Sequence, residues 1–263
     1  MLLRLFSLVC TVLAVANGFV ISPPSNDIAY SYALDLSQLT STSSFSCIRQ
    51  NGYTVAFIRV YSPANGGAVD PNGCANIQNA YSANLGTEIY VTPQPSSSKA
   101  GYQQFDEFYN NLKQNGITVR TVWLQVTSPV NWPNTPTTNQ NFISSFVSRG
   151  GQYGISVGIY TSSYDWQQIT ASWTGLQTSV QLWYWNVFGS GVSGESPTTF
   201  DDFRSFGNWN QPAVKQFGQL ESVCSIAVNR DVYPSSNLAK QRLEEEIVAR
   251  QKAHQIVVGG LFH

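Results

Sequence analysis

The sequence predicts an α/β fold, a TIM-like barrel of eight strands in which five βα units are followed by three strands lacking helices. The 263 residues suffice for one barrel, and 42% of them are hydrophobic, enough for a large core. Apolar runs of strand length alternate with helical patterns over much of the chain. This alternation indicates parallel strands with right-handed crossovers, and eight strands can close into a barrel.

Each of the first five predicted strands precedes a predicted helix. Branched and aromatic residues fill the strands, whereas the helical segments repeat apolar residues three and four positions apart. The expected strands are 32–38, 55–62, 87–95, 119–126 and 156–162. The expected helices are 43–52, 74–86, 101–116, 138–154 and 165–173.

The alternation stops after the fifth helix. Residues 181–187, 213–219 and 225–233 form strand-like runs with no clear helix between them. Residues 237–253 hold a large share of the charge and few apolar residues, which predicts an amphipathic helix packed on the barrel or trailing from it. We expect a solvated appendage rather than a partner-binding helix.

The N-terminus has the pattern of a secretory signal. Arg4 precedes an apolar run from Leu5 to Ala16, and cleavage is expected near Asn17 or Gly18. No later segment has the roughly 20 apolar residues that a transmembrane helix needs, so we expect no membrane association after signal removal. The predicted organisation is a signal peptide at 1–18, a barrel at 19–234 and a helical C-terminal tail at 235–263.

Cysteine and histidine usage limits the chemistry that the mature chain can support. Cys47, Cys74 and Cys224 remain after signal removal, and this odd count allows one disulfide plus a further thiol without fixing the pair. His254 and His263 both lie in the tail, so the barrel has no histidine for a zinc site or a Ser–His or Cys–His pair. We expect no metal and no cofactor.

The charge balance argues against nucleic-acid binding. The formal net charge is −1, charged residues make up 11% of the chain, and no Lys/Arg cluster occurs. Binding to the phosphate backbone depends on such a basic surface. The sequence therefore predicts no nucleic-acid partner.

Six segments together resemble glycoside hydrolase family 25, above all its nematode-type lysozymes and their amoebal relatives. They are YALDLSQ, NGYTVAFIRVYS, VWLQVTSP, VGIYTSSYDWQQI, LWYWNV and VNRDVY, and the resemblance covers about residues 30–234. It implies a barrel whose first five strands carry helices. It also implies secreted antibacterial defence directed at peptidoglycan, with cleavage between N-acetylmuramic acid and N-acetylglucosamine.

The family's acidic positions are largely neutral in this chain. The family pattern has an Asp on the first strand, Asp-x-Glu on the fourth and a further Asp on the last. Asp35 matches the first position, whereas Gln125 and Thr127 fall on the Asp-x-Glu pair and Asn229 on the last Asp. Glycoside hydrolysis normally needs two carboxyl groups, and neither Gln nor Thr can act as an acid near neutral pH.

We therefore expect a lysozyme-like pseudoenzyme that binds peptidoglycan or a related N-acetylated glycan, with catalysis lost or strongly reduced. Two alternatives stay open. An active N-acetylmuramidase could pair Asp35 with a relocated acid: Asp231, expected two residues nearer the mouth than Asn229, or a loop acid (Asp70, Asp165 or Glu195). A secreted protein-interaction module is the other, and the tail and the odd cysteine count are its only motivation.

Aromatic residues near the expected mouth are candidates for sugar binding. The chain contains seven Trp, and 13% of its residues are aromatic. Trp132 follows the fourth strand, Tyr160 lies near the end of the fifth, and Trp183 and Trp185 alternate on the sixth. Their faces could stack on sugar rings while Asn, Gln and Thr bond hydroxyl and acetamido groups. Trp123 lies inside a strand and is expected in the core.

Overall fold

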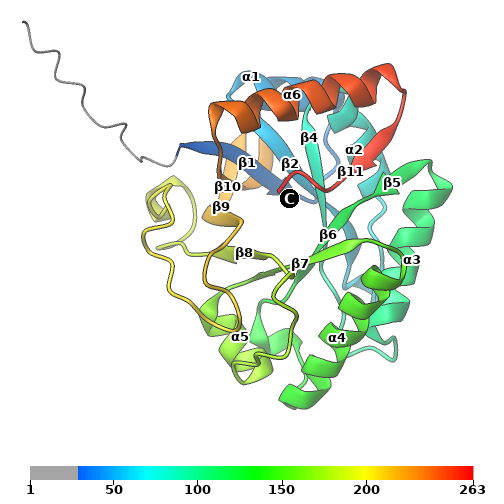
Figure 1. Cartoon of the computed structure of the whole chain (residues 1–263), viewed down its shortest axis with the longest axis vertical. Helices are drawn as coiled ribbons and strands as arrows, with labels where there is room; N and C mark the ends of the chain where they lie inside the picture. The colour runs from blue at the N-terminus through cyan, green and yellow to red at the C-terminus, as the bar shows by residue number, and fades with distance from the viewer. Residues whose placement is uncertain (1–28, 263) are drawn as a thin grey trace, which may run out of the picture.

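The computed structural model describes residues 29–262 and confirms the α/β barrel (Figure 1). The predicted signal peptide, 1–18, lies outside the described residues. Pairing of β1 with both β2 and β10 closes the ring. The barrel strands are β1 (Tyr30–Leu36), β2 (Tyr53–Ser62), β4 (Gly86–Val91), β6 (Thr121–Gln125), β7 (Ser156–Thr161), β8 (Leu182–Trp185), β9 (Val214–Val223) and β10 (Ile226–Pro234).

Each of the first five barrel strands is followed by a helix on the outside of the ring, as predicted (Figure 1). The helices are α1 (Thr42–Gln50), α2 (Gly73–Ser82), α3 (Gly101–Gln114), α4 (Pro136–Gln152) and α5 (Ser163–Thr170). Serine caps fix two of the starts, because Ser41 accepts from the Ser44 N–H and Ser162 from the Asp165 N–H. The extra strand β3 (Ala68–Val69) pairs with the end of β2.

Two hydrophobic clusters build the core. The larger lies between the strands and the surrounding helices. The smaller fills the inside of the ring, as expected for an eight-stranded barrel whose interior is packed with side chains. Its buried members are Ala33, Val55, Phe57, Tyr90, Trp123, Tyr160, Trp183, Val214 and Tyr233.

The last strand, β10, runs antiparallel to both of its neighbours. Only Cys224 and Ser225 separate it from β9, and both have positive φ, which suits a two-residue hairpin turn. In the β1–β10 register, Asn229 faces Asp35, whereas Asp231 faces Ala33. Asp231 therefore lies two residues deeper in the barrel than Asn229, and the expectation that it lies nearer the mouth is wrong.

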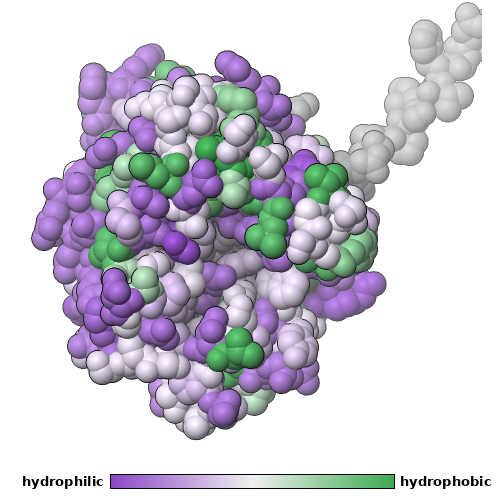
Figure 2. Space-filling view, turned by 180° about the vertical axis from the view of Figure 1, so that it is seen from behind, coloured by the Kyte–Doolittle hydropathy of each residue, from purple (hydrophilic) through white to green (hydrophobic). Residues whose placement is uncertain are grey.

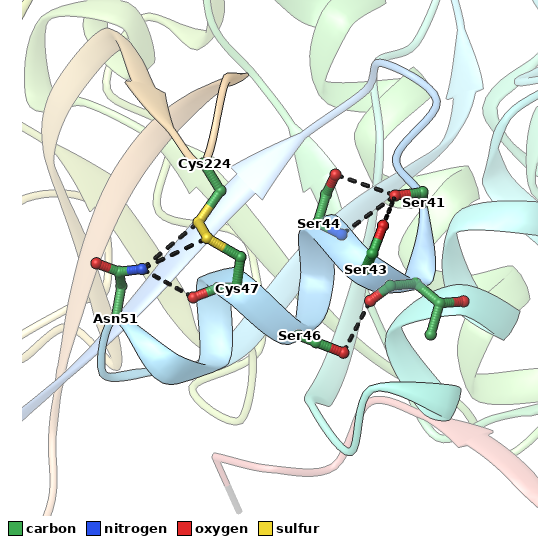
Figure 3. Close-up of a disulfide and its surroundings, with 8 residues drawn as sticks. Ser41, Ser43, Ser44, Ser46, Cys47, Asn51 and Cys224 are labelled. Atoms are coloured by element: carbon green, nitrogen blue, oxygen red, sulfur yellow. Dashed lines mark hydrogen bonds between the residues drawn. A yellow bond between two sulfur atoms is a disulfide. The ribbon is translucent and has the colours of Figure 1, made fainter.

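The structure resolves the cysteine pairing. Cys47 on α1 forms a disulfide with Cys224 in the β9–β10 turn, across a sequence separation of 177 residues (Figure 3). The Asn51 amide donates to the Cys47 carbonyl at 2.9 Å beside this bridge. Cys74 is a free thiol, partly buried, that donates to Asn111 Oδ1 at 3.1 Å. The disulfide thus ties the final hairpin to the first helix.

The C-terminal tail packs against the barrel and is no solvated appendage. Helix α6 (Asn237–Lys252) leads to β11 (Ile256–Val258), which pairs with β5 (Ile117–Val119) in a separate two-stranded sheet. Leu261 and Phe262 then pack against the interior cluster. The tail lies over the centre of the ring in Figure 1 and closes the end where the parallel strands begin.

No helix within residues 29–262 combines the length and apolar character needed to cross a membrane.

Candidate functional site

A pocket of about 690 Å³ lies at the ends of β2, β4 and β6. Figure 2 shows the face of the molecule that is turned away from the tail. This face is largely hydrophilic and is hollowed near its centre. Among the described residues, no Asp or Glu lines the pocket, and Arg59 is its only charged side chain. The lining residues are Arg59, Ser62, Pro63, Ala64, Thr92, Pro93, Gln94, Ser96, Gln125, Thr127, Ser128, Val130, Asn131 and Trp132.

Gln125 and Thr127 lie side by side in this pocket. Gln125 is the last residue of β6, and its Nε2 donates to Thr127 Oγ1 at 2.9 Å. The Thr92 hydroxyl donates to Gln125 Oε1 at 2.6 Å. An amide and two hydroxyls therefore present hydrogen-bonding groups without a negative charge or an acidic proton.

Trp132 forms one wall of the pocket. Its Nε1 donates to the Thr127 carbonyl at 3.0 Å, and its ring meets Phe142 edge-on at a centroid distance of 5.8 Å. These two contacts fix the ring between the loop after β6 and helix α4. Because the side chain is largely buried, only part of the ring is open to a ligand.

Asp35 lies inside the barrel and does not line the pocket. The carboxylate is 4% exposed and accepts two hydrogen bonds, from Gln216 Nε2 at 2.6 Å and from Asn229 Nδ2 at 2.9 Å. The Tyr160 hydroxyl extends this chain by donating to Gln216 Oε1 at 2.8 Å. Burial raises the pKa of Asp35 to about 6, although both amide hydrogen bonds oppose the rise.

Asp231 forms a second, deeper carboxyl group next to Asp35. It is fully buried and accepts from Trp183 Nε1 at 2.9 Å. Burial and the neighbouring charge of Asp35 raise its pKa well above the ordinary value. Asp231 therefore lies beneath the mouth rather than at it.

Comparisons with known proteins agree with this architecture. A family model described as Lysozyme-like protein 1 matches residues 26–217. Lysozyme-like protein 1 of Caenorhabditis elegans is 52% identical over 244 residues, which cover 90% of this chain and 81% of the relative. A probable GH family 25 lysozyme of Dictyostelium discoideum is 31% identical over 76% of this chain and 90% of its own.

The chain belongs to the lysozyme-like proteins of glycoside hydrolase family 25. Among solved structures, the bacterial lysozyme from Streptomyces coelicolor shares the fold with a TM-score of 0.61. It is 21% identical and aligns over 82% of this chain and 98% of its own.

The four positions at which the family pattern places acids lie in two different parts of this structure. Gln125 and Thr127 line the open pocket, whereas Asp35 and Asn229 bond to each other inside the barrel. The structure thus brings the positions together in pairs. Of the four side chains, only Asp35 carries a carboxyl group.

The other candidate acids do not line the pocket, and each has a structural partner. Asp70 accepts from Arg59 Nε at 2.6 Å. Asp165 lies in the first turn of α5, is buried, and accepts from Trp185 Nε1 at 2.8 Å. Glu195 pairs with Arg230. These contacts give each acid a role in the fold.

Three of the four aromatic candidates lie away from the pocket. Tyr160 and Trp183 pack against each other inside the barrel, with ring centroids 4.2 Å apart and an interplanar angle of 31°, and Trp183 is 0% exposed. Trp183 is therefore a core residue rather than a sugar contact, because strand alternation turns it into the packed interior. Trp185 is only partly buried, and its indole N–H already bonds Asp165. Trp123 is fully buried, as expected.

Sequence reasoning missed Arg59, Thr92 and Gln216. Arg59 had a visible signal, since it is the only charged residue in the apolar run VAFIRVYS. Gln216 lies in the predicted strand 213–219, where a polar residue between Val214 and Gly218 on one side indicates a polar contact inside the barrel. Thr92 carried no comparable signal.

Proposed function

We propose that this protein is secreted and binds bacterial peptidoglycan, or a related N-acetylated glycan, without cleaving it. One observation carries the proposal. The pocket is lined by Gln125 and Thr127, the residues expected at the family's Asp-x-Glu pair, and no described carboxylate lines it.

Cleavage needs a carboxyl group that can protonate the leaving oxygen and a second one on the other side of the bond. Asp35 is buried beneath two amides, and Asp231 lies deeper still. Loss of general acid catalysis alone lowers a rate by about 10²–10⁴. With both pocket acids absent, we expect turnover to be negligible.

The pocket keeps the properties of a binding site. Its volume of about 690 Å³ falls within the common range for ligand pockets, roughly 300–1,000 Å³. Hydroxyl and amide groups from Thr92, Gln125 and Thr127 can bond sugar hydroxyls and acetamido groups, and Trp132 offers part of an aromatic face. This lining supports retention of glycan binding.

Two features support secretion. Residues 1–18 have the signal-peptide pattern. The Cys47–Cys224 disulfide suits an oxidising compartment. A secreted peptidoglycan-binding protein would act in antibacterial defence by attaching to the cell wall.

The test measures sedimentation of the purified protein with insoluble peptidoglycan and release of reducing ends in the same sample. We expect saturable binding without release above the buffer level. Thr127→Val removes the pocket hydroxyl at nearly constant shape and should weaken binding by about tenfold. Thr178→Val, at an exposed site outside this pocket, should bind as the native chain does. Absence of binding, or release by the native chain, would contradict the proposal.

A further inference from the structure

Arg59 is the one charged side chain that the described part of the chain places in the pocket lining. On the inward face of β2, Arg59 is the next residue after Val55 and Phe57 in the direction of the mouth. Its side chain is 28% exposed, so the guanidinium is partly desolvated but still reachable. A ligand in the pocket would therefore meet a cation held at the wall.

Asp70 fixes this guanidinium from behind. Asp70 is buried, accepts from Arg59 Nε at 2.6 Å, and uses its other oxygen to accept from the Asn72 N–H at 2.9 Å. The ion pair between Arg59 and Asp70 therefore engages only the Nε atom of the guanidinium. Within residues 29–262, neither Nη1 nor Nη2 of Arg59 has a hydrogen-bond partner.

Terminal guanidinium nitrogens form a planar set of donors that matches the two oxygens of a carboxylate. The rest of the pocket does not oppose an anion, because Gln125 and Thr127 are neutral. Negative charges at those two positions would repel a carboxylate in the same pocket. The replacement of the family acids thus leaves Arg59 without a competing anion in the lining.

We propose that Arg59 recognises a carboxylate carried by the muramyl unit of the glycan, so that the pocket prefers peptidoglycan strands to chitin. This inference rests on the proposed glycan binding. Chitin consists of N-acetylglucosamine units and carries no carboxylate. The muramyl unit offers one through its lactyl group or, where that group is amidated, through the attached peptide.

Titration calorimetry on the whole chain tests this with three ligands of equal sugar length. They are a chito-oligosaccharide, a peptide-free muramyl glycan with free lactyl groups, and a muramyl glycan whose lactyl groups carry a dipeptide. We expect the native chain to bind at least one muramyl ligand about tenfold more tightly than the chito-oligosaccharide. Preference for the peptide-free ligand assigns the lactyl carboxylate, and preference for the other assigns the peptide.

Arg59→Gln should abolish this preference, because it lowers the affinity for the muramyl ligand about tenfold more than the affinity for the chito-oligosaccharide. Because Gln at this position leaves buried Asp70 without its cation, the double variant Arg59→Gln/Asp70→Asn is measured too, with circular dichroism to verify folding. Arg149→Gln is the matched control, since Arg149 also pairs with an Asp at 2.7 Å, on the outer helices, with a similar side-chain exposure of 30%.

Three outcomes decide the matter. Loss of preference in both Arg59 variants, with chito-oligosaccharide binding retained, supports the inference. Equal native affinities for all three ligands, or a preference that survives in Arg59→Gln, overturns it and leaves glycan binding intact. Absence of native binding to every ligand overturns the proposed function itself.

Discussion

Asn229 donates its side-chain N–H to Asp35 at 2.9 Å, between the antiparallel strands β10 and β1. These are two of the positions at which family 25 members are expected to carry acids. A carboxylate and an amide make a favourable pair at this distance, whereas two carboxylates would need a shared proton. The barrel interior is thus adapted to a neutral residue at 229.

We expect Asn229→Asp to lower the free energy of unfolding by about 1–3 kcal/mol at pH 7. The new acid would gain a raised pKa beside Asp35, so its destabilising charge is lost as the pH falls through that folded-state pKa. Urea denaturation at pH 5 and pH 7 measures the difference. Asn229→Ala, which loses the bond without adding a charge, should lack the extra pH dependence. Equal effects of both variants at each pH would contradict this account.

Glu88 gives the barrel a pH-dependent stability at its closed end. It is fully buried and accepts from Trp123 Nε1 and the Leu261 N–H, both at 2.9 Å. Burial raises its pKa from 4.5 to about 7. Between these two values the folded chain keeps a proton that the unfolded chain releases, so stability falls as the pH rises through this window. Asp35 acts in the same direction up to about 6.

Glu88→Gln should flatten this dependence by up to about 1.4 kcal/mol per pH unit, the value for one proton. Chemical denaturation at half-unit steps from pH 4.5 to 7.5 measures the slope. The control is Glu245→Gln, at an exposed position on α6, which should leave the slope unchanged. A Glu88→Gln slope equal to that of the native chain would show that Glu88 does not take up the proton on folding.

Phe262 joins the tail to the barrel interior. Its ring stacks on Phe57 with a centroid distance of 5.7 Å and an interplanar angle of 9°, and it meets Tyr233 at 4.9 Å. We expect Phe262→Ala to lower the unfolding free energy by about 3 kcal/mol. Val248→Ala, at a 48% exposed position on α6, should cost far less. An unchanged melting temperature for Phe262→Ala would mean that the tail is not part of the cooperative fold.

The first five βα units could be predicted from sequence because helix and strand periodicity are local properties. The direction of β10 could not be read the same way. It depends on a turn of two residues, Cys224 and Ser225, which forces a hairpin, and a strand assignment alone does not show this. Because β10 runs antiparallel to β1, Asp231 lies deeper in the barrel than Asn229 rather than nearer the mouth.

Other features depended on packing between distant segments. Alternation along the strand placed Gln125 and Thr127 correctly at its end. It does not show whether an aromatic residue on a neighbouring strand faces the pocket or the interior, because that depends on the register of the barrel. Trp183 is the example, since it packs against Tyr160 in the barrel interior. The tail was misjudged because α6 itself has few apolar residues, and the anchoring contacts come from Leu261 and Phe262 beyond it.

The most direct measurement compares reducing-end release from peptidoglycan by the native chain, by Asp35→Asn and by Gln125→Asp/Thr127→Glu. We predict no release above the buffer level from the native chain and from Asp35→Asn. The double variant, which returns two carboxyl groups to the pocket, should release measurable ends. Release by the native chain that disappears in Asp35→Asn would contradict the account and show that Asp35 works with another acid.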